Sequence, residues 1–258
     1  MLQRQMPVST MCSQVARGLG FRIVSGEFQP GDTIPVEAQL CESYGVSRST
    51  IREAIKDLVS KGLIEVSPKI GTRVQGVSAW NLLDSDVLKW RLYSKFDDDI
   101  IREIYEIRFC FEPRAAYLTA LHTNKGQIQR LEHSMGNIRA NRLRPKELVD
   151  SCIEMHLAIL ESSGNTLMVT LGGLVKSTIQ TLRHFRKSDN VDWEALINVY
   201  AGVYNAIIER EPETARELMT NLLIRSRSWA FAIVKDYKSS LSNAHSSNPK
   251  PMMDLNSR

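Results

Sequence analysis

The chain has 258 residues, 43% of them hydrophobic, and a formal net charge of +4 at pH 7. This size and apolar content suffice for two folded domains, and charges interrupt the apolar runs too often for a membrane span of about 18 residues. The mild positive charge permits an anionic partner without requiring one, so the placement of charge along the chain has to identify the partner. Because the first residues lack the apolar centre of a secretory signal, we expect a cytoplasmic protein without a membrane partner.

Glycine and proline cluster in the first 76 residues, and the pattern there begins with two short helices. Val15, Leu19 and Ile23 recur at helical spacing and predict a first helix, which ends at the loop GEFQPGD. A second helix through Leu40 is expected to end at Gly45, because glycine adopts a positive φ at little cost.

A third helix and a hairpin complete this part of the chain. Ser47 is a good N-cap for the helix. Its predicted buried side consists of Ile51, Ala54, Ile55 and Leu58. Two short strands around 63–66 and 73–75 flank a turn at Pro68. The order of these elements predicts a winged helix-turn-helix domain over residues 10–76, with the hairpin as its small β wing.

Beyond residue 78 the chain has few helix breakers, and we predict no strand there. The expected helices cover roughly 78–94, 97–122, 125–141, 145–163, 166–187, 192–210 and 212–238. Residues 239–258 are rich in Ser, Asn and Pro and predict a flexible tail. The chain is therefore predicted to be mainly α, with an all-α bundle over 78–238 that binds an effector and dimerises.

The second and third helices are joined by a turn with glycine, as in a helix-turn-helix whose second helix enters the major groove. Arg48, Arg52 and Lys56 recur every four residues and form a basic stripe opposite the apolar side. We expect Arg48 to reach a base edge, and Arg52 and Lys56 to meet phosphates. The alternative is a solvated face, which the combination of turn, cap, stripe and wing disfavours. The predicted DNA-binding residues are Ser47, Arg48, Ser49, Thr50, Arg52, Lys56, Lys69, Gly71, Thr72 and Arg73.

The run PVEAQLCESYGVSRSTIREAIKDLVSKGLIEVSPKIGTRV resembles the GntR family of bacterial regulators. The family signature is an acidic and aliphatic second helix, GVSR, a REAL-like run and a glycine wing. The resemblance covers residues 10–76 and implies binding to double-stranded operator DNA. It departs at Ala38, where many relatives carry an arginine that contacts DNA, so no operator sequence is carried over.

Two later runs, IYEIRFCFEPRAAYLTA and MHLAILESSGNTLM, resemble the effector domain of the FadR subfamily. The resemblance implies a FadR-like bundle and a pocket containing Arg108, Cys152, His156 and Tyr200. Arg108 would pair with a carboxylate or phosphate of the ligand, and the alternative is an internal ion pair with Glu106 or Glu112. WNLLDSDVLKW at 80–90 resembles regulators of galactonate operons, which implies a sugar acid such as an aldonate or hexuronate.

Many FadR-like domains hold a divalent metal through one Asp and three His residues. The matching positions here are Cys152, His156, Tyr200 and Leu222. Leucine cannot ligate, tyrosine rarely does, and a Cys/His pair leaves an ion mostly to water. We therefore predict no metal cofactor, with a zinc-like ion on Cys152 and His156 as the alternative. Structural roles for the two side chains, as a small buried thiol and a hydrogen-bonded core histidine, also remain open.

Because one helix-turn-helix reads only a half-site, we expect a homodimer on an imperfect palindrome. The predicted function is repression of a sugar-acid catabolic operon, relieved when the metabolite binds. An acyl-coenzyme A or another carboxylate is the alternative ligand, and activation is the alternative response. A helical-bundle enzyme is the remote alternative, but the sequence has no HExxH, GxSxG, Walker or GxGxxG motif.

Overall fold

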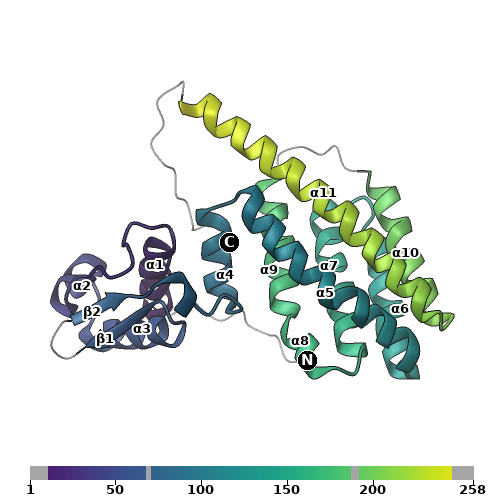
Figure 1. Cartoon of the computed structure of the whole chain (residues 1–258), viewed down its shortest axis with the longest axis horizontal. Coiled ribbons are helices and arrows are strands. Elements are labelled where there is room, and N and C mark those ends of the chain that lie inside the picture. The colour runs from purple at the N-terminus through teal and green to yellow at the C-terminus, as the bar shows by residue number, and fades with distance from the viewer. Residues whose placement is uncertain (1–10, 68–70, 187–191, 246–258) are drawn as a thin grey trace. The chain divides into compact units, whose positions relative to one another are not determined.

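The computed structural model describes residues 11–67, 71–186 and 192–245, and the chain divides into two compact units, 1–96 and 97–258. Helices dominate both units (Figure 1). Within the described residues the strands form one two-stranded sheet, in the first unit. The predicted fold class, a mainly α chain with a small β wing near its N-terminus, is confirmed. Among the described helices, none has the length and apolar content to cross a membrane.

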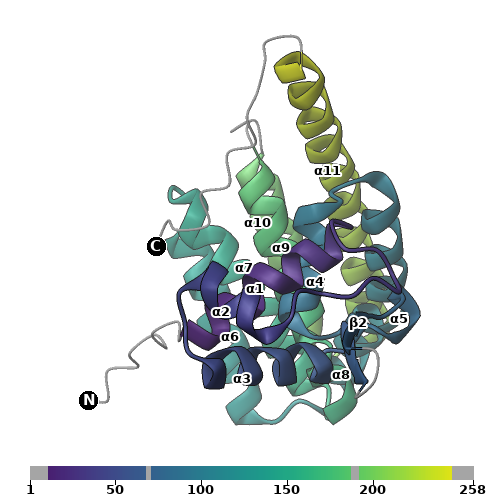
Figure 2. The same ribbon diagram turned by 90° about the vertical axis from the view of Figure 1, so that its left-hand side faces the viewer.

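The first unit begins with three helices: α1 (Met11–Val24), α2 (Glu37–Tyr44) and α3 (Arg48–Ser60). Helices α1 and α3 contact each other and lie one above the other in Figure 2. Gly45 ends α2 with a φ of 64°, and the Ser47 hydroxyl caps α3 by accepting the Thr50 backbone N–H. The sequence predictions for this turn are therefore confirmed.

The wing is an antiparallel hairpin of β1 (Ile64–Ser67) and β2 (Gly71–Val74), with Ile64 opposite Val74. A third segment, which the sequence pattern does not predict, also pairs with β2. The Gly31 N–H donates to the Val74 carbonyl at 2.9 Å, and the Ile34 N–H donates to the Thr72 carbonyl at 3.0 Å. Strand β2 is thus hydrogen-bonded on both sides, which holds the wing against the helices.

The first unit extends beyond the predicted boundary at residues 76–78, to residue 96. The predicted helix over 78–94 is a short 3-10 turn, η1 (Val77–Ala79), followed by α4 (Ser85–Ser94). Helix α4 starts anew because the Asp84 carboxylate accepts the N–H groups of its first turn. The Trp90 ring packs against Gly20 of α1, where a Cβ atom would collide with it. Helix α4 therefore belongs to the core of the first unit.

Lys61, the C-cap of α3, is a buried cation in the first unit. Its ammonium lies 2.9 Å from Asp84, 3.4 Å from Asp86 and 3.6 Å from Asp57. Burial acts to lower the pKa of Lys61, but the hydrogen bond to Asp84 and the three carboxylates reverse this and raise it. Since Asp84 caps α4, the ion pair joins the end of α3 to the start of α4.

Replacing Lys61 by methionine is expected to lower the unfolding free energy of the first unit by about 1–3 kcal/mol, because Asp84 loses its charged hydrogen-bond partner. Urea unfolding of the full chain measures the loss, and hydrogen exchange of peptides from α3 and α4 locates it. Lys56→Met is the control, since its ion pair with Glu53 leaves 72% and 60% of the two side chains exposed. That variant should change stability by less than about 1 kcal/mol. Equal losses in both variants would contradict a role for the Lys61 ion pair.

The second unit is a helical bundle. Its helices are α5 (Asp98–His122), α6 (Lys125–Ala140), α7 (Pro145–Ser162), α8 (Thr166–Thr170), α9 (Gly172–Phe185), α10 (Trp193–Ile208) and α11 (Pro212–His245). Helices α5 and α11 run side by side (Figure 1). The predicted helices agree with these bounds to within about two residues, with two exceptions. The helix over 166–187 is interrupted at Leu171, just before two glycines, and α11 is longer than predicted.

Helix α11 continues to His245, beyond the predicted end at residue 238. The Ser239 hydroxyl donates to the Lys235 carbonyl and the Ser240 hydroxyl to the Tyr237 carbonyl. The serines thus satisfy their hydroxyls within the helix and do not end it. The prediction of a flexible tail from residue 239 is therefore wrong for 239–245, and the remainder of that tail lies outside the described residues.

Candidate DNA-binding and effector sites

Helix α3 presents the predicted basic stripe on its exposed face. Ser47, Arg48, Ser49, Arg52 and Lys56 are exposed, and Thr50 is half-buried. On the opposite side Ile51, Ala54 and Leu58 are fully buried, whereas Ile55 is only half-buried. The predicted separation into a core face and a charged face is thus present in the structure.

The three cations of the basic stripe differ in their partners. The Arg52 Nε lies 3.1 Å from the carboxylate of Glu37 on α2, and the Lys56 ammonium lies 2.8 Å from Glu53. Arg48 has no ion pair among the described residues. Exposed ion pairs contribute about 1 kcal/mol or less, so a phosphate can displace the carboxylates. For Arg48, at the start of α3, the described part of the chain contains no such competitor.

Three hydroxyl groups gather at the N-terminus of α3. The Ser47 Oγ lies 2.8 Å from the Ser49 Oγ and 2.9 Å from the Thr50 Oγ1. Backbone N–H groups in the first turn of a helix lack intrahelical partners and favour anions, phosphates included. This end of α3 can therefore hold a phosphate while Arg48 extends to a base edge.

The described part of the wing carries three of its four predicted DNA-binding residues. Gly71 is exposed with a φ of 92°, a conformation in which a side chain would be strained. Thr72 is half-buried opposite Val66, and Arg73 is exposed on the strand paired at both edges. Lys69, the fourth residue, lies outside the described residues.

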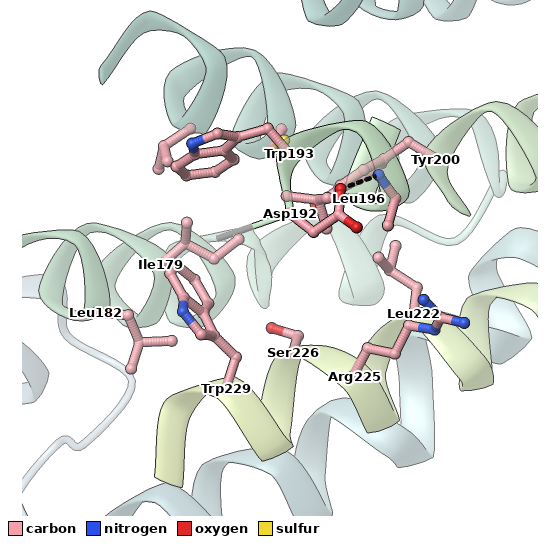
Figure 3. Close-up of a pocket in the computed structure, with 13 residues that line it drawn as sticks. Ile179, Leu182, Asp192, Trp193, Leu196, Tyr200, Leu222, Arg225, Ser226 and Trp229 are labelled. Carbon is pink, nitrogen blue, oxygen red and sulfur yellow. Dashed lines mark hydrogen bonds between the residues drawn. The ribbon is translucent and has the colours of Figure 1, made fainter. Parts of the chain in front are cut away.

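The second unit contains a cavity of about 270 Å³ between α7, α9, α10 and α11, which we name the bundle cavity (Figure 3). Its lining consists of Val149, Cys152, Ile179, Leu182, Asp192, Trp193, Ala195, Leu196, Tyr200, Leu222, Arg225, Ser226 and Trp229. Most of these side chains are apolar, and two are tryptophans. Such a lining, with a few polar groups, is typical of a small-molecule site.

The four predicted pocket residues divide into two groups. Cys152 and Tyr200 line the bundle cavity, whereas Arg108 and His156 are not among its lining residues. The His156 Nε2 lies 3.0 Å from the hydroxyl of the lining residue Tyr200, so His156 is adjacent to the lining of the cavity. The structure thus brings these three side chains together but does not place Arg108 against the cavity.

Arg108, Glu112 and His156 form a buried polar cluster, with exposed fractions of 0%, 1% and 3%. The Arg108 Nε donates to Glu112 Oε1 at 2.5 Å, and the His156 Nδ1 lies 2.5 Å from Glu112 Oε2. Burial acts to raise the pKa of Glu112, but Arg108 and then His156 outweigh it and lower the pKa to about 2. The alternative predicted for Arg108, an internal ion pair with Glu112, is the arrangement that the structure has.

The metal-binding positions implied by the FadR resemblance do not fit a divalent ion. Both ring nitrogens of His156 have polar partners, Tyr200 and Glu112, and the Leu222 side chain cannot ligate. Cys152 offers one thiol, and a Cys/His pair leaves most ligand positions of a divalent ion to water. The described residues contain no group of three His, Cys, Asp or Glu side chains suited to a metal.

Of the α11 wall of the bundle cavity, the sequence resemblance pointed only to Leu222, as one of four metal positions. Leu222, Arg225, Ser226 and Trp229 line it from one face of α11. Their spacing of three and four residues is visible in the sequence, but it does not distinguish a cavity from a packed core. The Ser226 Oγ also lies 2.5 Å from the buried Tyr105 hydroxyl, so it connects the cavity with α5.

Comparisons with known proteins agree with both units. A family model described as bacterial regulatory proteins, gntR family, matches residues 12–74, and an FCD domain model matches 103–225. The uncharacterized HTH-type transcriptional regulator YieP of Escherichia coli is 31% identical over 81% of this chain and 90% of its own length. The galactonate operon transcriptional repressor of the same species is 28% identical over 81% of this chain and 91% of its own length.

Solved structures share the fold at low sequence identity. Lar, which controls expression of the Listeria monocytogenes agr system, has a TM-score of 0.60 and 19% identity, covering 88% of this chain and 99% of its own. Escherichia coli McbR/YncC has a TM-score of 0.50 and 17% identity, covering 87% of this chain and 99% of its own. At these identities the likeness shows the fold alone.

Proposed function

Because the chain belongs to the GntR family of bacterial regulatory proteins and carries an FCD domain, we propose that it is a homodimeric repressor released by a small carboxylate. The class of protein is a DNA-binding transcriptional regulator and not an enzyme. In this proposal the first unit binds a half-site of operator DNA in the cytoplasm, and the second unit binds the metabolite in the bundle cavity.

The observation that carries the proposal is the exposed face of α3. Arg48, which has no ion pair among the described residues, lies there with two further cations and a cluster of hydroxyl groups, as suits a helix in the major groove. Arg48 would read a base, while Arg52, Lys56 and the capping hydroxyls would hold phosphates. The wing residues Gly71, Thr72 and Arg73 would add backbone contacts beside the groove.

Repression and release follow from the coupling of two binding sites. A ligand that binds more tightly to a dimer whose recognition helices no longer match the operator lowers the affinity for DNA. DNA lowers the affinity for the ligand by the same factor, because the coupling between two sites is reciprocal. The relative called a galactonate operon repressor supports repression and a sugar acid. A relative called the Glc operon transcriptional activator, 27% identical over 222 residues, supports activation as the second candidate.

Selection of DNA sites from a random pool by the purified protein tests the proposal. We expect a palindrome whose half-sites lie about one helical turn, or roughly 10 base pairs, apart. Titration of that complex with candidate carboxylates, sugar acids among them, should then dissociate it. Retention of the complex at every ligand concentration would contradict release, and no enrichment at low salt with folded protein would contradict DNA binding itself.

A further inference from the structure

The bundle cavity is aromatic at one end and cationic at the other. Figure 3 shows Trp193 and Trp229, with Ile179 and Leu182, on the left of the view and Arg225 on the right. Trp193 and Trp229 come from different helices, α10 and α11, and both are half-buried. A ligand that fills this cavity therefore meets indole rings with one part and a guanidinium with another.

Arg225 is the cation among the described lining residues. It is exposed and has no ion pair among the residues that the structure describes. The carboxylate among the described lining residues, Asp192, accepts the Ala195 backbone N–H at 2.9 Å as the N-cap of α10. An unpaired guanidinium beside an apolar cavity is suited to an anionic group on the ligand, above all a carboxylate that it binds through two hydrogen bonds.

The size of the cavity limits the ligand. An apolar cavity of roughly 150 Å³ holds one benzene molecule. The bundle cavity of about 270 Å³ therefore has room for a fused bicyclic ring or for a single ring with a short side chain. The adenosine and pantetheine parts of an acyl-coenzyme A would have to lie outside a cavity of this size.

The two hydroxyl groups of the lining are already hydrogen-bonded, which disfavours a sugar acid. The Tyr200 hydroxyl is bonded to His156, and the Ser226 hydroxyl to Tyr105. A sugar acid carries a hydroxyl on nearly every carbon, and each one that is buried without a partner opposes binding. An aromatic ring instead gains from burial against the two tryptophans.

We infer that the bundle cavity binds a compact aromatic monocarboxylate, with its ring against Trp193 and Trp229 and its carboxylate at Arg225. This inference rests on the proposed function, because it names the class of metabolite that acts as effector. It departs from the sugar acid predicted from the sequence.

Calorimetric titration of the full chain with indole-3-acetate, phenylacetate, phenylacetamide, galactonate and gluconate tests the inference. We expect the two aromatic acids to bind at least tenfold more tightly than either sugar acid. Arg225→Gln should weaken the binding of indole-3-acetate about tenfold or more, since a charge-assisted hydrogen bond is lost. The same variant should leave phenylacetamide, which lacks the carboxylate, within about twofold of its wild-type affinity.

Arg216→Gln is the matched control, because Arg216 lies on the same helix, pairs with Glu213 and is not among the described lining residues. The Arg216→Gln variant should bind both aromatic acids with wild-type affinity. Trp229→Leu should lower the affinity for both acids. Tighter binding of a sugar acid, failure of both aromatic acids to bind, or equal losses in the Arg225 and Arg216 variants would overturn the ligand class. DNA binding by the same samples without ligand separates this failure from failure of the proposed function.

Discussion

Replacing Arg48 by alanine is expected to weaken binding to the selected operator by about 1–3 kcal/mol and to relax the base preference at one position of each half-site. Arg48 is exposed at the start of α3 and has no ion pair among the described residues, so no interaction within the protein has to be broken to reach DNA. A bidentate contact with guanine O6 and N7 accounts for the size of the effect. Binding to the selected site and to its single-base variants measures both parts.

Lys56→Ala is the comparison for Arg48→Ala, because Lys56 lies two turns further along the same stripe. Its loss should weaken binding about equally on all sequences and reduce the dependence of affinity on salt. If Arg48→Ala lowered the affinity equally for every DNA sequence, Arg48 would contact a phosphate and not a base. The stability of either variant should be unchanged within about 0.5 kcal/mol, since both side chains are exposed.

The first unit was predictable where local residues fix the backbone. Gly45 and Ser47 determine where α2 ends and where α3 begins, and both act through contacts within a few residues. The pairing of residues 31–34 with β2 was not predictable, because the partners are some 40 positions apart and the segment reads as a loop. Likewise, the packing of Trp90 on Gly20 depends on a tertiary contact that no local pattern reveals.

The bundle cavity was predictable only in part. Resemblance located Cys152, His156 and Tyr200 in one place, and they do lie together. It could not tell that Arg108 pairs with Glu112 and does not line the bundle cavity, since an arginine and a glutamate four residues apart suit either role. The sequence pattern indicates that Arg225 is a surface residue of a long helix. Its position at the cavity follows only from the three-dimensional structure.

Replacing Arg108 by alanine is expected to lower the unfolding free energy of the second unit by about 3–5 kcal/mol, because Glu112 is left as an uncompensated buried charge. The sequence alone predicts a different result, a stable protein that no longer responds to ligand. Full burial of the guanidinium and its two contacts with the Glu112 carboxylate, at 2.5 and 3.3 Å, favour the loss of stability. Urea unfolding of the full chain distinguishes the two results.

A double variant, Arg108→Met with Glu112→Leu, separates the cost of an unpaired charge from the cost of lost packing. Buried ion pairs replaced by apolar side chains of similar volume are often as stable as the original pair. The double variant should therefore recover most of the loss. Arg130→Ala is the control for removing a paired arginine, since its pair with Glu161 is exposed and should contribute less than about 1 kcal/mol. An Arg108→Ala protein as stable as the wild type, yet not released from DNA by ligand, would instead make Arg108 a ligand contact.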